Sequence, residues 1–151
     1  MEKKNPIEEA KRYLANAKEI LRNKAKKDGD FYQDGKYTRM AGKCMWNGCL
    51  IALKPALGLT VKRGQRLDID DFKEAASKRD KKLLSNVVEG YNIMHLSMGY
   101  DGTTAVGVVS NGVKVMGNII AWCEANAPKP VALSGTKTSA RKRTTKRTKK
   151  A

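Results

Sequence analysis

The sequence predicts an all-α protein, a four-helix antiparallel bundle that carries a disordered basic C-terminal tail. Within residues 1–126, apolar side chains recur at spacings of three and four along several segments, as they do on one face of a helix. From Ala127 onward this periodicity stops, and Pro, Ser, Thr, Gly, Lys and Arg dominate. Such a composition buries too little apolar area to offset the entropy of ordering the chain. We therefore expect a helical domain over residues 1–126 and a disordered Lys/Arg-rich tail over residues 127–151.

The first helix is predicted to begin at Pro6, which suits the first helical position, with Asn5 as its N-cap. The sequence Asp28-Gly29-Asp30 is predicted to stop it. The apolar stripe of this helix has spacings of three, four, three and four and consists of Ile7, Ala10, Leu14, Ala17 and Leu21.

A second helix is predicted from about Tyr37 to Leu57, with small residues on its apolar face and Pro55 near its end. Residues 58–67 read as a basic loop. Asp68 is a suitable N-cap for a third, long helix that we expect to continue to about Met98. The charged middle of this helix, Ser77 to Lys82, is expected to face solvent.

Two patterns conflict between Asp101 and Asn126. Asn111-Gly112 is flanked by valines, which is a strong hairpin signal, and glycine disfavours a helix interior. A helical stripe runs through the same residues, and an isolated hairpin would be marginal beside three helices. We favour a helix, with a hairpin over Val106–Val115 as the alternative. The helical stripe consists of Val106, Val109, Val113, Met116, Ile120 and Cys123.

The net charge of +16 is concentrated in the tail. Nine of the 31 basic side chains lie there, with no acidic one. Residues 1–126 therefore contain the other 22 basic and all 15 acidic side chains, which gives them a net charge of +7. Lys and Arg that neutralise phosphates release counterions and give affinity without sequence preference. We expect the tail to contact DNA or RNA through Lys137, Arg141, Lys142, Arg143, Lys146, Arg147, Lys149 and Lys150.

Three cysteines form an odd set without a C-x-x-C pair, which favours reduced thiols over a disulfide framework. The first 25 residues are charged throughout and contain no signal-like apolar run. No segment approaches the ~20 apolar residues of a membrane span. We therefore expect a soluble cytoplasmic protein that does not contact membranes.

Three stretches resemble an uncharacterised family of short bacterial helical proteins, a domain of unknown function. They are Asn5 to Leu14, Tyr37 to Ala41 and His95-Leu-Ser-Met-Gly-Tyr-Asp-Gly. The resemblance covers about residues 5–126 and implies a four-helix bundle, which favours the helix after Asp101. It implies no activity and no binding residues.

The implied bundle is similar to the higher-eukaryote and prokaryote nucleotide-binding (HEPN) domains. Many of those cleave RNA with an Arg followed four to six residues later by a His. His95 is the only histidine here, and positions 88–91 are Val, Glu, Gly and Tyr, so the ribonuclease motif is absent. The resemblance then implies a non-catalytic member that binds a small nucleotide or a catalytic partner such as a nucleotidyltransferase.

His95 is the strongest candidate for a ligand site, because it shares a helical stripe with Tyr91 and lies near Tyr100 and Asp101. The alternative interpretation is a partly buried histidine that bonds a loop carbonyl. One histidine does not make a zinc site, and we predict no metal, no cofactor and no catalytic residues.

Other chemistry-bearing residues have simpler structural interpretations. We expect Asp68, Asp70 and Asp71 to cap a helix and complement its dipole rather than bind magnesium. Trp46 and the other aromatic residues are expected to pack in the bundle, although Phe31, Tyr32 and Tyr37 form a candidate contact surface. The function expected from the sequence is therefore non-enzymatic: nucleic-acid contact by the tail, and dimerisation or partner binding by the bundle.

Overall fold

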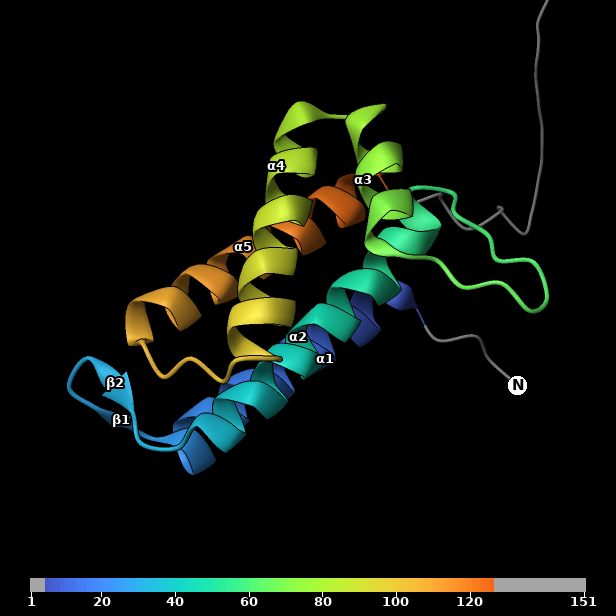
Figure 1. The fold of residues 1–151 in the computed structure, drawn as a ribbon. Coiled ribbons are helices and arrows are strands. Elements are labelled where there is room, and N and C mark those ends of the chain that lie inside the picture. Colours follow the sequence, from blue (N-terminus) through green and yellow to red (C-terminus); the bar gives the residue numbers. More distant parts are fainter. Residues whose placement is uncertain (1–4, 127–151) are drawn as a thin grey trace, which may run out of the picture.

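The computed structural model describes residues 5–126, and these are mostly helical (Figure 1). The all-α prediction is confirmed, but the predicted count of four helices is not. The elements in chain order are helix α1 (Pro6–Ile20), π-helix η1 (Leu21–Ala25), strands β1 (Lys27–Asp28) and β2 (Phe31–Tyr32), helices α2 (Gly35–Ala56), α3 (Ile69–Ser77) and α4 (Lys81–Gly90), π-helix η2 (Tyr91–Met98) and helix α5 (Val106–Asn126).

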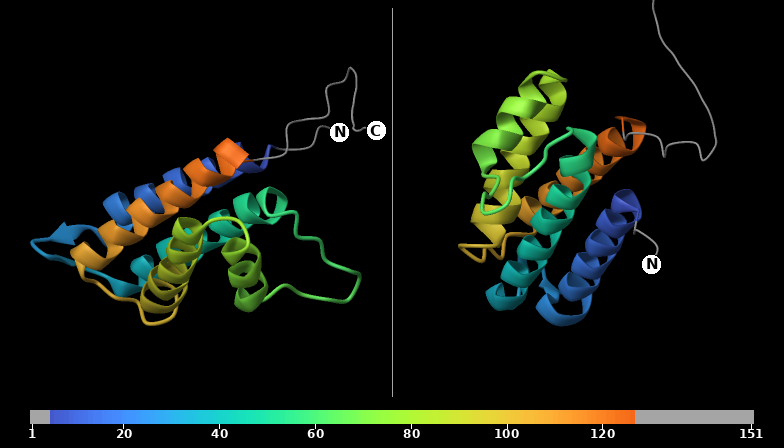
Figure 2. Two further views of the ribbon diagram at one scale, coloured as in Figure 1. Left: turned by 90° about the horizontal axis from the view of Figure 1, so that it is seen from above. Right: turned by 90° about the vertical axis from the view of Figure 1, so that its right-hand side faces the viewer.

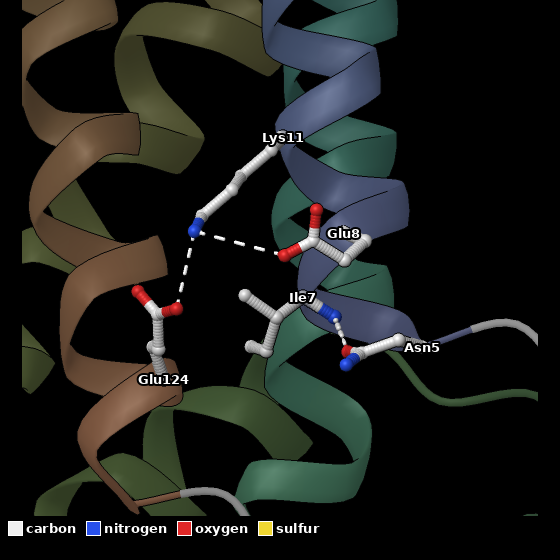
Figure 3. A network of polar contacts seen from close by, with 5 residues as sticks. All are labelled: Asn5, Ile7, Glu8, Lys11 and Glu124. Atoms are coloured by element: carbon white, nitrogen blue, oxygen red, sulfur yellow. Dashed lines mark hydrogen bonds and ion pairs between the residues drawn. The ribbon is translucent and has the colours of Figure 1, made fainter.

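Helix α1 begins as the sequence predicts. The Asn5 side chain accepts a hydrogen bond from the Ile7 backbone N–H at 2.8 Å, which satisfies one of the free donors of the first turn. Lys11 ties this helix to the end of α5, since its Nζ lies 3.1 Å from Glu124 and 3.9 Å from Glu8 (Figure 3). The first and last helices therefore lie side by side and antiparallel (Figure 2).

The segment predicted only to stop the first helix forms a short antiparallel hairpin. Lys27 pairs with Tyr32 and Asp28 with Phe31, around a turn in which Gly29 has a φ of +65°. Asp-Gly before two aromatic residues is a hairpin signal. The hairpin also joins the chain before α5, because Tyr32 N–H donates to the Thr104 carbonyl at 2.7 Å.

Helix α2 is the central element, packing against α1 on one side and against α5 and η2 on another. Its N-cap is Asp34, whose side chain accepts from the Lys36 N–H, so the helix starts two residues before Tyr37. Pro55 lies in the last turn. Residues 58–67 form no helix or strand and extend from the body as the predicted loop (Figure 1).

The prediction of one continuous third helix is wrong. Helix α3 begins at the predicted cap Asp68 but ends at Ser77, and α4 starts again after Asp80. The Asp80 side chain accepts hydrogen bonds from the N–H groups of Lys82 and Leu83, so it caps a new helix. The charged stretch expected to be a solvated helix face is instead the turn that lets α3 fold back on α4 (Figure 1).

The choice of helix after Asp101 is confirmed, since α5 spans the whole conflict region. Gly112 is buried there, and a Cβ at this position would lie only 2.9 Å from Ile93 Cγ2. The glycine that suggested a turn therefore allows α5 to approach η2 closely. Within the described residues, α5 has the length and composition of a membrane span, contrary to our expectation that no segment would. The buried side chains of α5 belong to the hydrophobic core in this fold. A helix that packs in a protein core can have the same length and apolar composition as a membrane span.

Candidate functional site

Tyr91 and His95 stand four residues apart on η2 and point the same way. Their rings stack, with centroids 4.9 Å apart and planes inclined by 27°. His95 is exposed and Tyr91 half-buried. No hydrogen bond of the His95 side chain occurs among residues 5–126, so the interpretation of a partly buried histidine bonded to a loop carbonyl is wrong.

Helix α2 brings a third ring, Trp46, to this pair. The Trp46 ring lies 5.8 Å from that of Tyr91, edge-on at 71°, and 6.4 Å from that of His95. Gly42 makes this approach possible, because a Cβ there would lie 2.5 Å from Met98 Cβ and 2.6 Å from the Met94 carbonyl oxygen. Since Gly42 and Trp46 are one turn apart on the same face, the close contact at Gly42 sets Trp46 against η2.

The three rings line one side of a groove of about 510 Å³, which we call the aromatic groove. This volume is within the range of small-ligand pockets. The other wall comes from the end of the basic loop and from the start of α3. Besides the three rings, the lining side chains are Lys43, Asn47 and Leu50 of α2 with Arg66, Leu67, Asp68, Ile69 and Phe72.

Two cations and one carboxylate belong to this lining. Lys43 and Arg66 are exposed, and neither takes part in an ion pair within residues 5–126. Asp68 is already engaged in a capping box: its carboxylate accepts from the Asp71 N–H at 3.1 Å, while Asp71 accepts from the Asp68 N–H at 2.8 Å. The predicted capping role of Asp68 is confirmed, and the groove keeps an excess of one positive charge.

Tyr100 and Asp101 do not belong to this groove. They lie on the turn after η2, where Tyr100 is 78% exposed and Arg39 donates to the Tyr100 carbonyl at 3.2 Å. The sequence placed them beside His95 because they are close along the chain. The π-helix ends between them, at Met98, and the turn carries them away from the rings.

The other candidate surfaces are dispersed or lie outside the described residues. Phe31 is 59% exposed, but Tyr32 is buried and Tyr37 half-buried, so they form no common aromatic face. The cationic residues Lys137 to Lys150 lie outside the described range 5–126. Within that range, no group of three or more His, Cys, Asp or Glu side chains is placed to hold a metal ion.

The cysteines lie in the packed interior. Cys49 and Cys123 are fully buried, and burial raises the pKa of both thiols, that of Cys123 to about 12. Burial also raises the pKa of Cys44, which is half-buried and donates to the Tyr13 carbonyl. All three are therefore protonated at neutral pH, as suits inert core residues rather than nucleophiles.

Sequence reasoning found two members of the aromatic groove, Tyr91 and His95, and missed the others. The sequence predicts that Trp46 packs in the bundle, and no local signal links it to a histidine 49 positions away. Lys43 and Arg66 are ordinary surface cations in the sequence. Only the packing of α2 against η2, and of the loop end over both, places them together.

The chain is similar to proteins of unknown function. The model of a family described as a domain of unknown function (DUF5618) matches residues 5–125. A solved structure of a protein of unknown function from Dyadobacter fermentans is 42% identical, with a TM-score of 0.72 over 80% of this chain and 93% of that chain. No curated protein matches. The uncharacterised-family resemblance is confirmed, whereas the similarity to HEPN domains is not confirmed by these matches.

Proposed function

Because the chain belongs to the DUF5618 family, whose function is unknown, we propose a role from its own groove: a non-catalytic protein that binds a nucleotide unit. The observation that carries this proposal is the Trp46–Tyr91–His95 cluster with Lys43 and Arg66 beside it, neither of which forms an ion pair within residues 5–126. Flat aromatic rings stack on every type of base, and Lys or Arg binds phosphate.

The parts of the aromatic groove suit the two halves of such a ligand. The exposed ring of His95 and the half-buried ring of Tyr91 offer a stacking surface, and the apolar side chains Leu67, Ile69 and Phe72 also line the groove. Lys43 and Arg66 supply positive charge on two different walls. Stacking of this kind contributes about 1–3 kcal/mol per base.

Calorimetric titration with adenosine monophosphate and uridine monophosphate tests the proposal. Adenosine supplies the ring without the phosphate, and ribose 5-phosphate supplies the phosphate without the ring. We expect both nucleotides to bind and both fragments to bind more weakly. His95→Ala is expected to weaken nucleotide binding about tenfold.

Matched variants separate the groove from general charge effects. Asn92→Ala changes an exposed neighbour on η2 outside the groove lining and is expected to bind like the wild type. Lys43→Ala should weaken the binding of nucleotides but not that of adenosine. Lys62→Ala also removes one exposed cation and should change neither binding affinity. Nucleotide binding that is absent, or unchanged by His95→Ala, contradicts the proposal.

A second proposal concerns the tail, and its support is the charge in the sequence. Nine cations without one acid in residues 127–151 favour loose, salt-sensitive contact with nucleic acid, with a Kd on the order of 10⁻⁴ to 10⁻⁶ M. Binding of duplex DNA by the full chain and by residues 1–126 should be compared across a salt series. We expect the shorter chain to bind more weakly and with a smaller salt slope; equal affinities would contradict a role for the tail.

A further inference from the structure

The hairpin and the start of α5 lie at the opposite end of α1 from its N-cap (Figure 2). A second groove is lined there by residues of α1, η1, the hairpin and the first half of α5. Its volume is about 560 Å³, which suits a small ligand. We call it the basic groove. It shares no lining residue with the aromatic groove.

The hairpin forms one firm wall of the basic groove. After η1 the chain reverses at Lys26, whose φ is +57°. Gln33 N–H then donates to the Ala25 and Lys26 carbonyls, and Val106 N–H donates to the Asp30 carbonyl at 2.9 Å. Backbone hydrogen bonds therefore join the hairpin to η1 on one side and to the start of α5 on the other, so the groove is bounded by ordered backbone.

The floor of the basic groove is apolar. Leu21, Tyr32 and Val109 are buried beneath it, and Val113 is half-buried at its side. Burying an alkyl chain on such a floor is favourable, because each methylene group is removed from water. The floor is thus suited to a flexible hydrocarbon rather than to a polar ligand.

The rim of the basic groove is cationic. Lys18, Arg22 and Lys27 line it and are exposed, and no Asp or Glu of the described residues belongs to the lining. None of the three takes part in an ion pair within residues 5–126. Three like charges around one opening repel one another, and an anionic group placed between them would relieve this repulsion.

We propose that the basic groove binds a single-chain amphiphile with an anionic head group. The hydrocarbon chain lies over Leu21, Val109 and Val113, and the carboxylate or phosphate lies among Lys18, Arg22 and Lys27. The chain's own tail is a poor occupant, because residues 127–151 contain no acidic side chain to meet the cationic rim. The proposal is independent of nucleotide binding in the aromatic groove.

The test uses the full chain, labelled with ¹⁵N, and dodecanoate below its micelle concentration. Binding is expected to shift the backbone resonances of Leu21, Val109 and Val113 in a saturable manner. Dodecyl phosphate should cause similar shifts, because its head group is also negatively charged. Dodecyl maltoside lacks the charge and acetate lacks the chain, so both should bind at least about tenfold more weakly.

Two charge-reversed variants test the rim at equal net charge. Lys18→Glu with Arg22→Glu should weaken dodecanoate about tenfold or more. Lys62→Glu with Lys114→Glu changes two exposed cations outside the basic groove and should leave dodecanoate binding unchanged. His95→Ala should also leave dodecanoate binding unchanged, which distinguishes this proposal from the previous one.

Several results would overturn the proposal. These are no shifts at Leu21, Val109 and Val113, equal binding of dodecyl maltoside, or equal loss in the two charge-reversed variants. Preferential binding of an acidic peptide over dodecanoate at the same resonances would also overturn it and would indicate a protein partner.

Discussion

Gly42 and Gly117 are both helical glycines, but they have opposite surroundings. A Cβ at Gly42 would meet Met98 Cβ at 2.5 Å and the backbone of Met94 and Gly99, which cannot move away cheaply. A Cβ at Gly117 would meet nothing within 4 Å. The identity of the residue is the same, and only its neighbours decide what a methyl group would cost.

We expect Gly42→Ala to lower the free energy of unfolding by about 1–3 kcal/mol or more, because overpacking displaces η2. Gly117→Ala should raise it by about 0.5–1 kcal/mol, because alanine loses less backbone entropy in a helix. Urea unfolding followed by circular dichroism measures both. Similar effects of the two substitutions would contradict the close packing of α2 on η2.

The buried thiols give a second prediction for single residues. Burial raises the pKa of Cys123 to about 12 and also raises the pKa of Cys49, so both thiols remain protonated at pH 8. A disulfide reagent at pH 8 should therefore modify Cys49 and Cys123 only as fast as the protein unfolds, with Cys44→Ser removing the half-buried site. Rapid modification in the folded protein would contradict their burial.

At the scale of elements, Asp80 separates α3 from α4. Its carboxylate accepts from the N–H groups of Leu83 and Lys82 and from the Trp122 indole of α5, at 3.2 Å. The backbone hydrogen bonds of Leu83 and Lys82 lower the pKa of Asp80 below its ordinary value of 3.8. The same side chain therefore starts α4 and connects that helix to α5.

Asp80→Ala is expected to reduce stability at neutral pH and to loosen the turn between α3 and α4. Because the pKa is lower in the folded state, the carboxylate stabilises the fold fully above pH 3.8, and this advantage is lost as the pH falls through the folded pKa. Urea midpoints of wild type and variant should converge at low pH. Asp70→Ala, in the first turn of α3, is the control; an equal, pH-independent loss in both variants would contradict the role of Asp80.

The molecule as a whole carries very uneven charge. Residues 127–151 raise the net charge from +7 to +16, while every buried residue identified in the described range lies between Ile7 and Cys123. Nine of the sixteen net positive charges therefore lie outside the range in which the hydrophobic core is described. The free energy of unfolding should therefore depend mainly on the core of residues 5–126, and long-range charge repulsion mainly on residues 127–151.

Removing residues 127–151 should change the free energy of unfolding by less than about 1 kcal/mol, the usual scale for exposed charges. The shorter chain is expected to be the more stable one at low salt, and the difference should vanish at high salt as repulsion is screened. Urea unfolding of both chains at two salt concentrations measures this. A large loss on truncation would show that the tail supports the fold.

The sequence alone determined the helical class, the start of α1 at Pro6, the cap at Asp68, the loop at 58–67 and the segregation of charge. Each follows from signals a few residues apart: a capping side chain, a stripe at helical spacing or a run of like charges. The Asp-Gly signal of the β1–β2 hairpin is also local, although the prediction drawn from it covers only the end of the first helix.

Tertiary structure decided the remaining features, because they depend on contacts between residues far apart in the chain. Gly112 lies inside α5, where the absence of a Cβ lets this helix pack closely against Ile93. The third predicted helix divides at Asp80, whose carboxylate also bonds Trp122, 42 residues away. Trp46 meets Tyr91 and His95 only because Gly42 brings α2 against η2. Local signals do not determine where these helices end, and packing decides both their ends and which side chains share a groove.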